Sequence, residues 1–485
     1  MTWFPRLLSC TRPRIRTIMT TVAPPPDKTA TGAAAPIAAL ATASATATMD
    51  TPAPTPTPRV PIPPRGVDYR GKLVLAPMVR SGELPSRLTA LHYGADLVWG
   101  PETVDHSMIG TTRRVNPRTG MIEWTRIPTN NKKVDSTVES VIFRIDPVRE
   151  ASRLIFQLGT SDPARAVEAA RLVAPDCVGI DVNAGCPKPF STSGGMGAAL
   201  LKTPDKLVAI LEALVRDVAP AAQIGISVKI RILETPAETE VLVRRLVATG
   251  ITGLTLHCRT PDMRKTARAI RGQVRMVADV CREAGVAFLL NGDVETRSHA
   301  AELAYEFGTD GAMIATAAES NPSCFRSNAA GGLASWEEVV GKYLTYAIEV
   351  ENKLQNTKYL LAQMVPGKAG IHPKLHGCKS YRHIIELLGC TDLVDRAAAV
   401  DAVLNLPPPV APPPQLAAAK PSGTKRKRGA AAGASHDKKK KTVPSAQAKP
   451  PRSRSASPAR EAIEAAVGAA AAVAPQPVAA SSVAV

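Results

Sequence analysis

The segment Ile180-Asp181-Val182-Asn183-Ala184-Gly185-Cys186-Pro187-Lys188 decides the fold of this chain, and a glycine-rich loop, Ser193-Gly194-Gly195-Met196-Gly197-Ala198, follows shortly after it. The apolar residues at its start are typical of a strand buried in a parallel sheet. The turn after them presents a single thiol, Cys186, at the end of the sheet where such folds keep their chemistry. Taken alone, Cys186 is also compatible with an inert, packed cysteine, so its role depends on the surrounding sequence.

The composition of the 485-residue chain is uneven. Both ends are rich in alanine and proline and lack the aromatic and branched apolar residues that offset chain entropy, which predicts disorder. We therefore predict four segments. They are a disordered Ala/Pro/Thr-rich segment over 1–69, a catalytic domain over 70–328, a helical domain over 329–400 and a disordered basic tail over 401–485.

The formal net charge of +18 is concentrated in the C-terminal tail. Between Lys420 and Arg460, thirteen Lys or Arg residues accompany a single acid, Asp437. Such runs act as nuclear-import signals or as tethers to nucleic acid, the alternative being a tail that only solubilises. We expect the nucleus, the cytoplasm or both. The arginine-rich N-terminus, which has no acid before Asp27, keeps a mitochondrial location open.

Eight cysteines are scattered without a C-x-x-C pair, and no segment has the apolar length of a membrane span. The cysteine pattern argues against a zinc site and against a disulfide framework. We expect an intracellular protein without metal and without a membrane anchor, working as a monomer.

Short apolar runs alternate with amphipathic segments through the predicted catalytic domain. The runs are Leu73–Ala76, Asp96–Trp99, Leu154–Leu158, Val178–Val182, Ser227–Ile230, Leu254–His257, Ala287–Leu290 and Ala312–Ala315. Eight such units over about 250 residues predict an α/β fold, the (β/α)8 TIM barrel. A doubly wound open sheet is the alternative, but no run is followed by a G-x-G-x-x-G turn.

Further segments complete the predicted architecture. Pro163–Val173 and Pro204–Val218 are the clearest helices, each opened by a proline suited to a first helical turn. Ile122–Arg126 and Val141–Ile145 alternate apolar and polar residues, which predicts a β-hairpin on the barrel rim. Ser335–Leu388 has helical periodicity and predicts a small α-helical domain after the barrel.

A barrel keeps its catalytic groups at the carboxyl ends of its strands, and polar residues stand at each of these ends. In strand order, the residues at these ends are Pro77, Met78, Val79 and Arg80; Glu102; Gln157; Asn183 and Cys186; Lys229 and Arg231; His257 and Arg259; Asn291, Gly292 and Asp293; and Ala315 and Thr316. A single polar residue there also serves in turns, but eight in register indicate a site.

These side chains suit flavin mononucleotide (FMN). Met78 can lie against a planar ring, Gln157 can hydrogen-bond the edge of a heterocycle, and Lys229 and His257 can supply positive charge. The loops after the seventh and eighth strands predict a phosphate site. Each residue also has a structural reading, such as a core methionine or histidine, or a lysine whose ammonium reaches solvent.

Cys186 fits the role of a general acid. A thiol with a pKa near 8.5 is mostly protonated at neutral pH and can deliver a proton after a hydride has been added to a conjugated C=C bond. A nucleophilic cysteine would instead need a base that stabilises its thiolate, and His257 is the candidate for that base.

Five segments resemble the tRNA-dihydrouridine synthases, and within them the eukaryotic type 2 enzymes acting on uridine 20 of the D loop. They are Leu75-Ala76-Pro77-Met78-Val79-Arg80, Gly94-Ala95-Asp96, Ile180–Ala199, Val228-Lys229-Ile230-Arg231 and Asn356-Thr357-Lys358-Tyr359. The resemblance covers about 70–390. It implies an oxidoreductase that takes electrons from NADPH or NADH and uses FMN to reduce the C5=C6 bond of a tRNA uridine.

The resemblance also implies residue roles. Cys186 would donate the proton to C5. The flavin would be held by Pro77, Met78, Val79, Gln157, Lys229, His257, Asn291, Gly292, Asp293, Ala315 and Thr316, and the substrate by Glu102, Asn183, Arg231 and Arg259.

The chain departs from the family pattern at four places. Cys258 and Asp293 stand where glycine is usual, and Thr316 stands where an arginine would contact phosphate. The basic tail occupies the place of the double-stranded-RNA-binding domain of animal members.

Two other functions remain compatible with the sequence. One is a flavin dehydrogenase acting on a free pyrimidine or dihydroorotate. The other is a catalytically inactive RNA-binding homologue, which the loss of the arginine at Thr316 favours.

Overall fold

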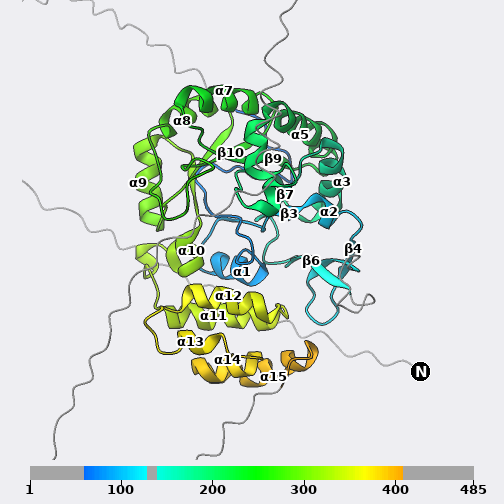
Figure 1. The fold of residues 1–485 in the computed structure, drawn as a ribbon, viewed down its shortest axis with the longest axis vertical. Coiled ribbons are helices and arrows are strands. Elements are labelled where there is room, and N and C mark those ends of the chain that lie inside the picture. Colours follow the sequence, from blue (N-terminus) through cyan, green and yellow to red (C-terminus); the bar gives the residue numbers. More distant parts are fainter. Residues whose placement is uncertain (1–58, 128–138, 408–485) are drawn as a thin grey trace, which may run out of the picture. The chain divides into compact units, whose positions relative to one another are not determined.

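The computed structural model describes residues 59–127 and 139–407 (Figure 1). Eight parallel strands form one sheet in the order β2-β1-β12-β11-β10-β9-β8-β7, and β7 pairs with β2 to close it. The predicted TIM barrel is confirmed, and each predicted strand agrees with the observed one to within two residues at either end. The strands are β1 (Leu73–Leu75), β2 (Leu97–Trp99), β7 (Leu154–Gly159), β8 (Gly179–Ala184), β9 (Gly225–Arg231), β10 (Gly253–His257), β11 (Ala287–Asn291) and β12 (Gly311–Ile314).

Helices surround the barrel (Figure 1). They are α1 (Leu84–His92), α3 (Pro163–Val173), α5 (Pro204–Asp217), α7 (Pro236–Val247), α8 (Val274–Glu283), α9 (Arg297–Phe307) and α10 (Thr316–Ser320), with short turns at α2 (Asp105–Met108), α4 (Pro189–Thr192) and α6 (Ala219–Ala222). Local sequence sets their starts. Asp162 caps α3 by accepting from the Arg165 amide, and Thr235 with Glu238 forms a capping box at α7.

The strands alternate between an outer and an inner face. On β9, Ile226, Val228 and Ile230 pack outward into the main hydrophobic core beneath the helices. Ser227 and Lys229 occupy the intervening positions, so they face the barrel axis. The lower part of the axis is filled by a second apolar cluster that includes Trp99, Leu289 and Met313. The polar inner positions lie above it, toward the carboxyl ends.

The segment over 59–69 belongs to the fold, which corrects the prediction of a disordered segment over 1–69. The Tyr69 side chain is 2% exposed and joins the cluster inside the barrel. A Cβ at Gly253 would lie 2.3 Å from the Tyr69 ring, so the glycine makes room for it. Arg65 donates to four backbone carbonyls, among them Ala222 and Pro175. A prediction from composition alone could not detect these contacts. The rest of the predicted disordered segments, residues 1–58 and 408–485, lies outside the described residues.

The predicted rim hairpin has a third strand. β5 (Ile122–Arg126) pairs with β6 (Ser140–Ile145) on one side and with β4 (Thr112–Val115) on the other, all antiparallel. Every residue of β4 is exposed, so it has no apolar alternation that the sequence could reveal. A two-residue strand, β3 (Thr103–Val104), pairs in parallel with the end of β7.

A buried ion pair joins this hairpin to the barrel. Arg87 of α1 donates from Nε to Glu150 Oε1 at 2.6 Å, and both side chains are 1% exposed. The same guanidinium donates to the carbonyls of Gly82 and Arg144, at 3.0 and 2.7 Å. Arg87 therefore ties α1, β6 and the loop after β1 together.

After the barrel, the chain forms α11 (Trp336–Glu349), α12 (Leu354–Met364), α13 (His372–Leu375), α14 (Tyr381–Leu388) and α15 (Val394–Val403). Helix α11 packs on α1, and α12 packs on α10. The Arg80 guanidinium lies 4.3 Å from the centre of the Tyr359 ring, so α12 also touches the loop after β1. Helix α15 extends past the predicted end of this domain at 400. In the described residues, no helix has the length and apolarity to span a membrane.

Candidate active site

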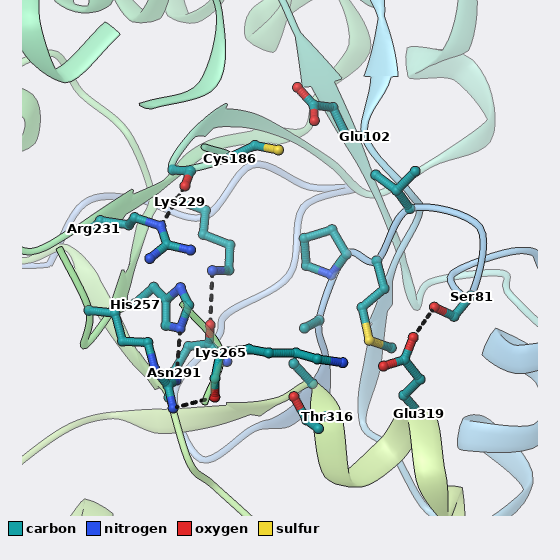
Figure 2. A pocket seen from close by; sticks show the side chains of 18 of the residues that line it. Ser81, Glu102, Cys186, Lys229, Arg231, His257, Lys265, Asn291, Thr316 and Glu319 are labelled. Carbon is teal, nitrogen blue, oxygen red and sulfur yellow. Dashed lines mark hydrogen bonds between the residues drawn. The ribbon is translucent and has the colours of Figure 1, made fainter. Parts of the chain in front are cut away.

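A cavity of about 600 Å³ opens at the carboxyl ends of the barrel strands (Figure 2). All sixteen residues to which the sequence gave a role in binding or catalysis line it, and they come from every strand of the barrel; Arg80, also named at a strand end, does not line it. The strand registers explain why. Arg231 of β9 lies beside His257 of β10, and His257 lies beside Asn291 of β11, so their side chains share one level of the rim. The volume is in the range of small-ligand and cofactor sites.

The turn after β8 holds Cys186 in this cavity. Asn183 accepts hydrogen bonds at its Oδ1 from the amides of Gly185 and Cys186, at 3.0 and 3.1 Å. This side-chain turn fixes the backbone just before the thiol. Asn183 is 6% exposed. It lines the cavity as predicted, but its oxygen is engaged in shaping the turn that presents Cys186.

Cys186 is held as a thiol. Burial, followed by the nearby Glu102 carboxylate, raises the pKa of Cys186 to about 11. Arg231 acts in the opposite direction but does not compensate. At neutral pH the sulfur therefore carries its proton, which suits a general acid and not a nucleophile.

Lys229 lies on the barrel axis with its ammonium inside the cavity. Its Nζ donates to Asn291 Oδ1 at 2.9 Å, while Asn291 Nδ2 donates to the Met313 carbonyl at 2.9 Å. Burial, and then the positive charge of Arg231, lowers the pKa of Lys229 to about 8. Lys229 is still mostly protonated at pH 7, so it can bind an anionic or electron-rich group.

His257 does not supply the positive charge that the sequence led us to expect. Burial and the neighbouring cations Lys229, Arg231 and Arg259 hold the pKa of His257 well below its ordinary value. Arg259 Nη1 lies 3.2 Å from His257 Nε2. Since a guanidinium only donates, Nε2 is the acceptor, and Nδ1 carries the proton of the neutral ring. His257 is therefore a neutral hydrogen-bonding group.

Arg259 and Asp293 hold the cavity wall together. Arg259 is 5% exposed and donates to Asp293 Oδ1 and to the backbone carbonyls of Ala267 and Lys265. Asp293 also accepts from the Ala269 amide at 2.7 Å. Both line the cavity, but their charged groups are paired with each other, so they order the loop after β10. Arg231 similarly donates to the carbonyls of Gly185, at 2.6 Å, and Thr260, at 2.9 Å.

Behind the cavity lining, in contact with Gln157, lies a buried carboxyl that the sequence analysis did not single out. Gln157 Nε2 donates to Asp181 Oδ2 at 2.8 Å, and Ser227 Oγ donates to Asp181 Oδ1 at 2.8 Å. Tyr69 Oη lies 3.3 Å from Ser227 Oγ. Because Asp181 takes the Gln157 amide nitrogen, the Gln157 carbonyl is the group left to accept from a ligand. Burial raises the pKa of Asp181 to about 6.

The loop after β1 and the start of α10 form the opposite wall. Ser81 Oγ donates to Glu319 Oε1 at 2.6 Å, which joins the Met78 loop to α10 (Figure 2). Gly292 has φ +119°, and a Cβ there would lie 3.2 Å from Ala269 Cβ. Lys265 also lines the cavity, and its side chain extends across it near Thr316 in Figure 2. Ser81, Lys265 and Glu319 were not predicted because they stand in loops and a short helix, not at strand ends.

The described residues contain no cluster of three or more histidine, cysteine or acidic side chains placed to bind a metal. Charged residues of both signs line the cavity, among them Lys229, Arg231 and Lys265, and Glu102 beside Cys186.

Residues 74–383 match the family model described as dihydrouridine synthase (Dus). The chain is 48% identical over 304 residues to tRNA-dihydrouridine(20) synthase (NAD(P)+) of Schizosaccharomyces pombe, covering 62% of this chain and 61% of that protein. It is 43% identical over 319 residues to tRNA-dihydrouridine(20) synthase (NAD(P)+) of Saccharomyces cerevisiae, covering 65% of this chain and 82% of that protein.

A relative with a different position in its name is more distant. The chain is 26% identical over 317 residues to tRNA-dihydrouridine(20a/20b) synthase (NAD(P)+) of Saccharomyces cerevisiae, covering 64% of this chain and 78% of that protein. The family match extends across the whole barrel and most of the helical domain, including each strand end that lines the cavity. The chain belongs to the dihydrouridine synthase family.

Proposed function

We propose that this protein is a flavin-dependent tRNA-dihydrouridine synthase that reduces the C5=C6 bond of a D-loop uridine, at position 20, with NADPH or NADH as the electron donor. The observation that carries the proposal is a protonated, half-buried thiol in the same cavity as a lysine–asparagine pair and a glutamine whose amide nitrogen is bound to Asp181, which leaves its carbonyl to accept from a ligand. The higher identity to relatives named for position 20 supports that position over 20a and 20b.

The cavity residues fit FMN. Gln157 offers its carbonyl to a heterocycle N–H, Lys229 offers a cation, and Met78 offers a flat apolar contact. Gly292 and Ala315 leave the backbone open to a phosphate, and Lys265 extends into the same corner, where Thr316 provides no charge. When bound, FMN would supply hydride chemistry.

The chain's own residues supply the proton and the orientation. After a hydride reaches C6 of the uracil ring, the negative charge at C5 takes the proton from Cys186 Sγ: the S–H bond breaks and a C–H bond forms. Asn183 fixes the turn that carries the thiol. The base has to leave the folded tRNA to reach the cavity, at a cost of a few kcal/mol.

The decisive experiment is dihydrouridine mapping of tRNA from cells that lack the protein. We expect the dihydrouridine at position 20 to disappear and to return with a wild-type copy but not with a Cys186→Ala copy. Persistence of every D-loop dihydrouridine in the deletion strain would overturn the assignment.

The affinity for FMN should depend on pH through Lys229. Since the pKa of Lys229 is lowered to about 8, the ammonium is present at pH 7 and is progressively lost as the pH rises through 8. We therefore expect the dissociation constant for FMN, followed by flavin fluorescence, to increase above pH 8. In Lys229→Gln the dissociation constant should already be higher at pH 7 and should change little between pH 7 and 9. A wild-type profile that stays flat to pH 9 would contradict this role.

The basic tail is proposed to contribute to the affinity for tRNA. It lies outside the described residues, and thirteen Lys or Arg residues fall between 420 and 460. Phosphate contacts release counterions and make binding salt-dependent. Truncation after Leu406 should raise the KM for tRNA, leave kcat nearly unchanged and flatten the salt dependence of KM. A KM equal to that of the full chain at all salt concentrations would rule the contribution out. The same runs support a proposed location in the nucleus.

A further inference from the structure

Glu102 reaches the cavity from the end of β2 and faces Cys186. Its Oε1 accepts a hydrogen bond from Ser191 Oγ at 2.8 Å, and Cys186 and Asn183 lie beside the same carboxylate. Figure 2 shows the Glu102 and Cys186 side chains close to each other at the same edge of the cavity. The carboxylate therefore lies directly beside the thiol expected to donate the proton.

One oxygen of this carboxylate is unusual. Among the described residues, Glu102 Oε2 is buried and has no hydrogen-bond partner of ordinary geometry. A buried carboxylate oxygen without a donor is costly, and such groups call for a reason. Burial also raises the pKa of Glu102. An apolar side chain would avoid this cost, so a carboxyl group at this position calls for a reason of its own, and the thiol of Cys186 is the group beside it.

Two glycines make the arrangement sterically possible. A Cβ at Gly159, the last residue of β7, would lie 2.7 Å from Glu102 Oε1. A Cβ at Gly197, which has φ +56°, would lie 2.4 Å from Ser191 Oγ and 2.5 Å from the Cys186 carbonyl. The close contact of Glu102, Ser191 and the Cys186 turn is therefore built into three separate segments of the chain.

The other charged groups around Cys186 have the opposite sign. Arg231 and Lys229 of β9 favour the thiolate, and His257 is neutral. Without Glu102, burial would still favour the thiol, but the charged groups near the sulfur would be positive, and positive charge near a cysteine favours the thiolate. Glu102 offsets that charge at short range.

We propose that Glu102 is a positioning residue whose carboxylate keeps Cys186 in the thiol form and fixed in place, so that the general acid stays loaded between turnovers. The inference rests on the proposed function for its catalytic meaning. After Cys186 gives its proton to C5, the thiolate beside Glu102 is a stronger base than an ordinary thiolate, and it recovers a proton from water.

The test is the pH dependence of Cys186 alkylation in the purified protein, with FMN bound and without tRNA. Iodoacetamide reacts with the thiolate, and mass spectrometry of the Cys186 peptide separates this site from the other cysteines. Glu102→Gln retains an oxygen for Ser191 but removes the charge. We expect the midpoint of its alkylation profile to fall by about one to two pH units, and the alkaline limb of the kcat profile to move in the same direction.

Glu319→Gln is the matched control. Glu319 lines the same cavity and accepts from Ser81 as Glu102 accepts from Ser191, but it does not contribute to the pKa of Cys186. Its alkylation midpoint should equal that of the wild type. An unchanged midpoint in Glu102→Gln, or an equal shift in both variants, would overturn the inference.

The wild-type protein provides a second measurement in case Glu102→Gln does not fold. Its Cys186 midpoint should lie above the ordinary thiol value of about 8.5, and a midpoint at or below that value would overturn the inference. Because alkylation needs no tRNA, the two proposals can fail separately. A shifted midpoint in a protein that does not reduce tRNA would refute the proposed function and leave the role of Glu102 standing.

Discussion

Replacement of Cys186 by alanine should slow dihydrouridine formation by about 10²–10⁴-fold, the usual contribution of a positioned general acid. The reason is geometric and electrostatic: the thiol is presented by the Asn183 turn, stays protonated at neutral pH and is the proposed proton donor in the cavity. Single-turnover reduction of tRNA, with product measured by mass spectrometry, gives the rate of the chemical step directly.

The variant should be specific for that step. FMN absorbance and the dissociation constant for tRNA should stay within about twofold of the wild type, because the residues proposed to hold the flavin are Gln157, Lys229 and Asn291, not Cys186. Cys390→Ala is the control: Cys390 is also half-buried but lies in the helical domain, outside the cavity. A Cys186→Ala protein that reduces tRNA at the wild-type rate would show that another group donates the proton.

The second large effect should come from Arg87→Met and concerns stability. Arg87 and Glu150 are each 1% exposed, so removing the arginine leaves an unpaired carboxylate in the interior. Breaking a buried pair from one side costs about 3–5 kcal/mol. The backbone carbonyls of Gly82 and Arg144 lose their donor as well. We expect the urea concentration at the midpoint of unfolding, measured by circular dichroism, to fall strongly.

Two comparisons separate the buried charge from a general effect of the substitution. Arg382→Met breaks an exposed pair with Glu386, whose side chains are 46% and 42% exposed, and should change stability by no more than about 0.5 kcal/mol. Arg87→Met combined with Glu150→Leu removes both charges and should recover a substantial part of the loss. If Arg87→Met and Arg382→Met are equally stable, the buried pair has no special role.

The sequence predicts the barrel well because its signals are local and repeated. Each inner strand is a short apolar run, and the polar residues at the strand ends, such as Lys229 and Asn291, must meet at one rim once the sheet closes. All the predicted site residues line one cavity for this reason. The positions of the inward residues follow from the two-residue period of a strand.

What the sequence could not predict depends on contacts between distant segments. Tyr69 follows a proline-rich stretch whose composition predicts disorder. Its place inside the barrel depends on the space left by Gly253, which is distant in the sequence. The neutral state of His257 depends on three cations from neighbouring strand ends. Asp181 had a recoverable signal, since it stands two residues before Asn183 on the same inward face of β8, but its partner Gln157 comes from another strand.

The position of Tyr69 inside the barrel has a kinetic consequence. With the amino end of the cylinder filled by Tyr69, Trp99 and Met313, the cavity is reached from its carboxyl end. If FMN takes up part of the cavity of about 600 Å³, the electron donor and the tRNA base both have to enter the remaining space from this end. The nicotinamide of the electron donor and the uracil of the tRNA would then enter the open end of the cavity one after the other. Initial-rate plots at several fixed donor concentrations should consequently be parallel, the pattern of a ping-pong enzyme.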